Sequence, residues 1–145
     1  MTRINLINCG ELTDQHLFAE WREIKMVPQS LKRSLAARGQ VGVLKIVPPT
    51  FRLNAGHVSF FYNKYKYLQK RYIALEKEIR HRGVHNYDRE AVLDRDGIFN
   101  ELPCEFHNDY EPTDDAITEV RQRIALRISQ RPGWYRYAGK VIHGY

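Results

Sequence analysis

The start of the chain holds two groups that could take part in covalent chemistry, the α-amine of Thr2 and the carboxylate of Glu23. Aminopeptidases remove Met before a small residue such as Thr, so we expect loss of Met1 to leave a free α-amine. An α-amine has a pKa of about 7.7 to 8.0, and its neutral fraction can attack an electrophilic carbon such as sugar C1′ to form a Schiff base. Every protein has an N-terminus, so this pattern alone does not establish a nucleophile.

The first predicted helix must position Glu23. It begins at Thr13 or Asp14, either of which can cap it, and it is predicted to end near Gly39. Pro28 should bend this helix or break it in two. Apolar residues recur at helical spacing along it, namely Leu17, Trp21, Ile24, Leu31 and Leu35.

His16, Glu20 and Glu23 lie at positions i, i+4 and i+7 of this helix and therefore share one stripe. A carboxylate on that stripe could face an N-terminal segment packed across the helix. A helical Glu beside an Arg, as Glu23 is beside Arg22, is ordinarily a solvated residue of little energetic consequence. The spacing therefore permits a site without requiring one.

Two further helices are predicted. The second ends at a cap formed by Gly83. Its buried stripe alternates steps of four and three residues through Phe61, Tyr65, Leu68, Tyr72, Leu75 and Ile79. The third starts at Thr113, carries Asp114 and Asp115 in its first turn, and stops at Pro132.

Residues 40–56 and 84–112 are rich in Pro and Gly punctuation and are predicted to be irregular connections. Long alternating runs typical of strands are missing from the sequence. The 145 residues therefore predict an all-α fold, a single compact domain (1–145) of three main helices with long irregular connections and the N-terminal segment packed across the helices.

Charge is distributed unevenly along the chain, whose formal net charge is +6. Residues 84–119 hold 2 Lys/Arg and 11 Asp/Glu, a balance of −9, which leaves 21 basic and 6 acidic residues elsewhere, a balance of +15. A basic surface of this kind suits a polyanion such as nucleic acid, although solvated helix faces would give the same count. With no signal peptide or membrane span in the sequence, and with two widely separated cysteines, we expect a cytoplasmic protein with reduced thiols.

The chain resembles the phage-type endonuclease V family, the pyrimidine-dimer DNA glycosylase/AP lyases, which are unrelated to the deoxyinosine-specific enzyme of the same name. The resemblance spans nearly the whole chain in order. Its motifs are Thr2-Arg3-Ile4-Asn5-Leu6, Glu11-Leu12, Asp14-Gln15-His16-Leu17, Ala19-Glu20-Trp21-Arg22-Glu23, Lys45-Ile46, Ala55-Gly56-His57-Val58, Phe60-Phe61-Tyr62, Gln130-Arg131-Pro132, Trp134-Tyr135-Arg136-Tyr137 and Gly139-Lys140.

The resemblance implies base excision coupled to strand cleavage. The Thr2 amine would attack C1′ of the 5′ nucleotide of a cyclobutane pyrimidine dimer, while Glu23 stabilises positive charge on the sugar and then serves as the base for β-elimination. The implied partner is double-stranded DNA that contains UV photoproducts or abasic sites. No cofactor or metal is implied, and we expect a monomer.

The resemblance also implies DNA contacts by two groups of residues. Polar and basic residues near the nucleophile are Arg3, Gln15, His16 and Arg22, and basic residues on the third helix are Arg123 and Arg127. Without the resemblance, Gln15 and His16 would be interpreted as ordinary surface residues at the start of a helix. The aromatic residues from Trp134 to Tyr137 could either stack on bases or close the core.

One departure from the family pattern limits the transfer of roles. The family commonly shows Arg-Glu-Leu-Pro-Arg where this chain has Arg22-Glu23-Ile24-Lys25-Met26, so a phosphate-binding arginine is replaced by Met26 and Lys25 can substitute only in part. Lesion preference can differ accordingly. Two alternatives stay open: a non-catalytic DNA-binding protein with a basic face, and a glycosylase of the same mechanism for another lesion.

Overall fold

The computed structural model describes residues 3–143, and within them the fold is helical, as predicted. The elements are α1 (Asp14–Glu23), α2 (Met26–Ile46), α3 (His57–Phe60), α4 (Tyr65–His81), α5 (Asp114–Gln130), β1 (Arg136–Tyr137) and β2 (Lys140–Val141). Single 3-10 turns occur at Cys9–Glu11, Ile98–Glu101 and Cys104–Phe106. No helix in the described part of the chain is long and apolar enough to cross a membrane.

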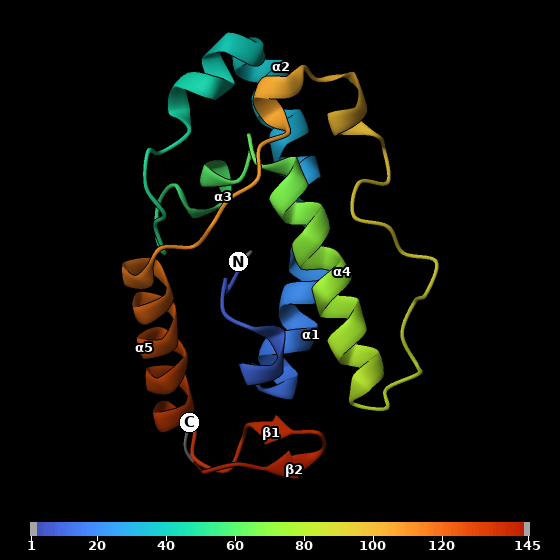
Figure 1. Ribbon diagram of the computed structural model, residues 1–145, viewed down its shortest axis with the longest axis vertical. Helices are drawn as coiled ribbons and strands as arrows, with labels where there is room; N and C mark the ends of the chain where they lie inside the picture. The colour runs from blue at the N-terminus through green and yellow to red at the C-terminus, as the bar shows by residue number, and fades with distance from the viewer. Residues whose placement is uncertain (1–2, 144–145) are drawn as a thin grey trace.

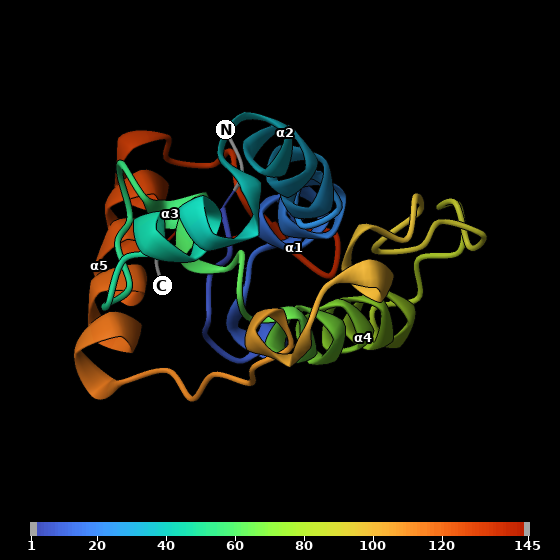
Figure 2. The same ribbon diagram turned by 90° about the horizontal axis from the view of Figure 1, so that it is seen from above.

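The N-terminal segment, residues 3–7, runs through the middle of the molecule. It lies between α5 on one side and the packed pair α1 and α4 on the other (Figure 1), and the view from above shows the same order (Figure 2). Ile4 and Ile7 are fully or almost fully buried. The predicted packing of the N-terminal segment across the helices is confirmed.

The first predicted helix is broken in two within the turn before Pro28, as predicted, since a proline clashes with the carbonyl group four residues before it. Helix α1 ends at Glu23 and α2 begins at Met26, so Pro28 falls in the first turn of α2, where its missing N–H costs no hydrogen bond. The predicted end of the first helical run near Gly39 is confirmed, because Gly39 leaves the helical conformation with φ 69° and ψ 174°. A second helical run follows within α2 as far as Ile46, where an irregular connection was predicted.

The second and third predicted helices are confirmed as α4 and α5. Gly83 has φ 78° just beyond the end of α4, a conformation that favours glycine. The Thr113 side chain accepts a hydrogen bond from the Ala116 N–H and caps α5. A short hairpin, β1 with β2, was not predicted, because two-residue strands leave no alternating pattern to read.

A buried ion pair joins α1 to α4 beneath the N-terminal segment. The Arg71 guanidinium donates to both carboxylate oxygens of Glu20, and the contact from its terminal nitrogen to Oε1 measures 2.9 Å. Glu20 is 1% exposed and Arg71 7%. Burial alone would lower the pKa of Arg71, but the Glu20 carboxylate raises it above its usual range, so the guanidinium stays charged.

The same pair holds a tight turn in the N-terminal segment. Glu20 accepts the Asn5 N–H at 3.1 Å, and Arg71 donates to the Ile7 carbonyl oxygen. Between them Leu6 adopts φ 58°, a left-handed conformation that is costly for a bulky residue. The ion pair therefore binds the backbone on both sides of the strained residue.

We predict that Glu20→Gln destabilises the protein by about 3–5 kcal/mol, because it leaves the Arg71 charge buried without its counter-ion. Equilibrium urea unfolding followed by circular dichroism measures this change. The exposed Glu119 on α5 supplies the matched control, since Glu119→Gln should alter stability by no more than about 0.5 kcal/mol. Equal effects of the two substitutions would contradict the assigned role.

Candidate active site

The Glu23 carboxylate lies at the end of α1, beside the first described residue of the chain. Its Oε1 accepts the Arg3 backbone N–H at 3.1 Å. Burial raises the pKa of Glu23, an effect that the Arg3 N–H and the Arg22 guanidinium oppose without cancelling. Thr2, the predicted nucleophile, lies outside the residues that the structure describes.

Three successive backbone N–H groups of the N-terminal segment donate to side chains instead of to other backbone groups. Those of Arg3 and Asn5 donate to Glu23 and Glu20, both on α1. The Ile4 N–H between them donates to Nε2 of His57 at 2.9 Å. The path of the segment is therefore set by side chains from two helices, because a buried N–H group must find a partner.

His57 is the first residue of α3 and is 1% exposed. Its Nδ1 donates to the Arg52 carbonyl oxygen at 2.7 Å, which leaves Nε2 as the acceptor that Ile4 uses. Burial lowers the pKa of His57 to about 4. The imidazole is therefore neutral at physiological pH.

Three arginines gather near Glu23. Burial lowers the pKa of Arg3 and of Arg123, and the neighbouring positive charges lower both further: Arg127 acts on Arg3, while Arg3 and Arg127 act on Arg123. Glu23 opposes the shift of both, so its carboxylate lies within the same electrostatic environment. A cluster of guanidinium groups with one nearby carboxylate can bind phosphate bidentately. We call Arg3, Arg123 and Arg127 the arginine cluster.

Gln15 and His16 contact the carboxyl-terminal part of the chain. Gln15 donates to the Trp134 carbonyl oxygen at 2.7 Å and accepts the Arg136 N–H at 3.0 Å. The His16 ring stacks on Tyr135 with centroids 4.9 Å apart and an interplanar angle of 4°. These two residues, expected to contact DNA, thus hold the segment that contains the aromatic residues.

The carboxyl-terminal aromatics divide between the two roles considered for them. Tyr135 is buried against His16, whereas Trp134 is 49% exposed and carries the Arg131 guanidinium 4.0 Å from its ring centroid. Tyr137 is 39% exposed, and its hydroxyl donates to the Gly10 carbonyl oxygen. Trp134 is therefore about half exposed to solvent, while Tyr135 belongs to the core.

Arg22 and Lys25 have different surroundings from the arginine cluster. Arg22 is exposed. The Lys25 ammonium lies 3.2 Å from the centroid of the Trp21 ring, and the charges that shift its pKa, after burial, are Glu76, Asp88 and Arg22. Lys25 thus faces Trp21 and the connection formed by residues 84–112, which we call the acidic connection. It does not extend the arginine cluster.

A sequence model of the pyrimidine dimer DNA glycosylase family matches residues 1–91. The chain belongs to this family. The match contains Arg3, Glu23 and His57 and most of the contacts that hold the N-terminal segment, whereas Arg123 and Arg127 lie beyond it. The predicted family is confirmed.

The acidic and basic residues of this glycosylase are partly separated in space as well as along the sequence. The first part of the acidic connection after α4 passes on the far side of α4 from α5, whereas its last part crosses to the start of α5 (Figures 1 and 2). Two arginines of the cluster lie in the second half of α5, whereas Asp114, Asp115 and Glu119 lie in its first half. A DNA backbone bound at the carboxyl-terminal half of α5 would therefore meet positive charge.

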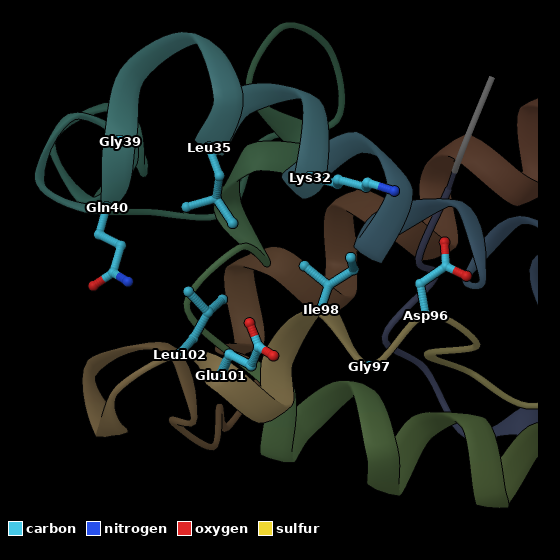
Figure 3. A pocket seen from close by; sticks show the side chains of 9 residues that line it. All are labelled: Lys32, Leu35, Gly39, Gln40, Asp96, Gly97, Ile98, Glu101 and Leu102. Atoms are coloured by element: carbon cyan, nitrogen blue, oxygen red, sulfur yellow. The ribbon is translucent and has the colours of Figure 1, made fainter.

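A hollow of about 420 Å³ lies between α2 and the 3-10 turn at Ile98–Glu101 (Figure 3). Leu35, Ile98 and Leu102 line it together with the carboxylates of Asp96 and Glu101. None of the predicted site residues lines this hollow. Lys32 also lines the hollow, so its charged lining is two carboxylates and one ammonium group, and this balance does not favour phosphate.

Sequence reasoning gave His57 and Arg71 no role. His57 was noted only as part of the motif Ala55-Gly56-His57-Val58. The usable signal was Gly56, which adopts φ 90° and starts α3 immediately before a buried histidine. Arg71 lies outside the apolar stripe predicted for the second helix, yet it is 7% exposed and paired with Glu20.

We predict that stability falls as the pH is lowered from about 6.5 towards about 4, partly because of His57. Its pKa is about 4 in the folded state and about 6.5 in the unfolded state, so the unfolded chain binds more protons in this window and the contribution of His57, complete above pH 6.5, is lost as the pH falls. Urea unfolding at pH 7 and pH 4.5 measures the loss. It should be smaller in His57→Gln than in wild type, and the exposed His81→Gln control should keep the wild-type loss. An unchanged loss in His57→Gln would contradict the low pKa.

Proposed function

We propose that this member of the pyrimidine dimer DNA glycosylase family excises cis-syn cyclobutane dimers through an imine between the Thr2 α-amine and sugar C1′, and then cleaves the strand by β-elimination. The observation that carries the proposal is the hydrogen bond from the Arg3 N–H to Glu23, within the part of the chain that matches the family. It ties the residue that follows Thr2 to a half-buried carboxylate, so an amine and a carboxylate could act on one sugar.

The first step is glycosidic bond cleavage. The neutral Thr2 amine forms a bond to C1′ of the 5′ nucleotide of the dimer, and the bond from C1′ to the base breaks with its electron pair leaving on the base, which is then protonated. The Glu23 carboxylate stabilises the oxocarbenium-like positive charge that develops on the sugar. Opening of the sugar ring and loss of a proton from nitrogen give the imine.

The second step is strand cleavage. The imine acidifies the hydrogen on C2′, and a base removes it while the bond from C3′ to its phosphate oxygen breaks. Glu23 is the assigned base, because burial raises its pKa and so makes its carboxylate a better proton acceptor. These steps use only groups of the protein and of DNA, and we assign no metal or cofactor to them.

The arginine cluster would hold the phosphates that flank the lesion. Arg3 adjoins the nucleophile, while Arg123 and Arg127 present guanidinium groups from α5. We place Arg22 at the edge of this surface and assign Gln15 and His16 to it through the carboxyl-terminal segment that they hold. Lys25 contributes only at long range, since it lies against Trp21. The protein would act as a cytoplasmic monomer on double-stranded DNA with photoproducts or abasic sites.

Borohydride trapping on a duplex with one cis-syn thymine dimer tests the proposal. Mature protein, with removal of Met1 verified by mass spectrometry, should give a covalent adduct that maps to the Thr2 nitrogen, and an N-acetylated form should give none. Glu23→Gln should lower the excision rate by at least about 10²-fold with damaged-DNA affinity retained, since it removes the charge-stabilising and proton-accepting group. The exposed Glu105→Gln is the control and should react at the wild-type rate.

The alternatives give different outcomes in the same experiment. An adduct on an abasic duplex alone would indicate a lyase, or a glycosylase with another target lesion. The protein could instead bind damaged DNA and form no adduct even though removal of Met1 is verified. That result would indicate a non-catalytic DNA-binding protein and overturn the enzymatic proposal.

A further inference from the structure

We propose that His57 is a positioning residue for the Thr2 amine, which it places by accepting the hydrogen bond of the Ile4 N–H. The role rests on the proposed function, since it concerns the same nucleophile. Ile4 is two residues from Thr2 in the chain and is fully buried. A contact at Ile4 therefore controls the backbone from which the amine projects.

The restraints on the N-terminal segment divide at Asn5. From Asn5 to Ile7 the segment is bound by the Glu20–Arg71 pair. On the side of Asn5 that leads to Thr2, two backbone N–H contacts hold it, from Arg3 to Glu23 and from Ile4 to His57. In the proposed reaction Glu23 stabilises positive charge and accepts a proton, so the charges around it change. His57 takes part in neither step, and its contacts can stay the same throughout.

His57 is itself held rigidly. Its Nδ1 donates to the Arg52 carbonyl oxygen, and its ring packs edge-on against Phe51 and Phe61 with centroids 5.3 and 5.6 Å away. Both ring nitrogens are thus bonded to backbone groups. No nitrogen is left to exchange a proton with substrate, so the geometry suits a positioning role and does not suit a general acid or base.

Substitution of His57 by the two amides separates positioning from mere structural support. His57→Gln places an amide where Nε2 lies and can still accept the Ile4 N–H, whereas His57→Asn reaches only the Nδ1 position and keeps only the Arg52 contact. A misplacement of about 1 Å can reduce a rate by about 10²-fold. We therefore expect His57→Asn to slow imine formation by at least about tenfold and His57→Gln to restore most of the rate.

The experiment measures the single-turnover rate of borohydride-trapped adduct on an abasic duplex with saturating protein. Circular dichroism gives the folded fraction of each variant, and fluorescence anisotropy gives its Kd for the same duplex. The expected result is a slow rate in folded His57→Asn with Kd within about twofold of wild type, because His57 lies beneath the segment and does not contact DNA in this account. His57→Phe, which keeps the ring volume without nitrogens, replaces His57→Asn if that variant does not fold.

Several results would overturn the positioning role. These are a wild-type rate in folded His57→Asn or His57→Phe, a His57→Gln variant as slow as His57→Asn, and a loss of rate matched by an equal loss of affinity. Failure of the proposed function is distinguished by the wild-type protein. If wild type gives no adduct at Thr2, the proposed function fails and the positioning role fails with it.

Discussion

The ion pair between Glu20 and Arg71 is the interaction on which the arrangement of the site depends. Burying two charges is costly, and such a pair is often no more stabilising than apolar residues of the same size. Here it also binds the backbone of Asn5 and Ile7 on either side of Leu6, whose left-handed conformation would not persist unsupported. The pair therefore contributes specificity of the backbone path, and that path leads to the Glu23 carboxylate.

Electrostatics around Glu23 follow from the packing of α5 across the N-terminal segment. The helix brings Arg123 and Arg127 to the same region as Arg3, so positive charges accumulate where one half-buried carboxylate lies. Bound phosphate would relieve the mutual repulsion of the arginines. The same burial that raises the pKa of Glu23 makes it a better proton acceptor, so in the proposed mechanism one packing arrangement would serve both DNA affinity and the reactivity of the carboxylate.

The features that could be predicted from the sequence are those that depend on residues close together in the chain. The apolar stripe of α4, the Thr113 cap of α5 and the turn at Gly83 depend on neighbouring residues and were predictable. The helical run between Gly39 and Ile46 was not, because Val43 within it is fully buried by contacts that are distant in sequence. The role of His57 could not be read from the sequence, since its partner Ile4 is 53 residues away. The hydrogen bonds of the Gln15 amide to the carboxyl-terminal segment were not predictable either, since they join residues that are about 120 positions apart.

The proposed mechanism requires the fold to place the Thr2 amine next to a sugar that is held beside Glu23. A crystal structure of the borohydride-reduced complex with an abasic duplex tests this placement most directly. We predict a covalent bond from the Thr2 nitrogen to C1′, a Glu23 carboxylate oxygen within about 3 Å of the reduced linkage, and the Ile4 to His57 hydrogen bond intact. A bond from C1′ to a lysine, or a Glu23 side chain turned away from the linkage, would contradict the claim.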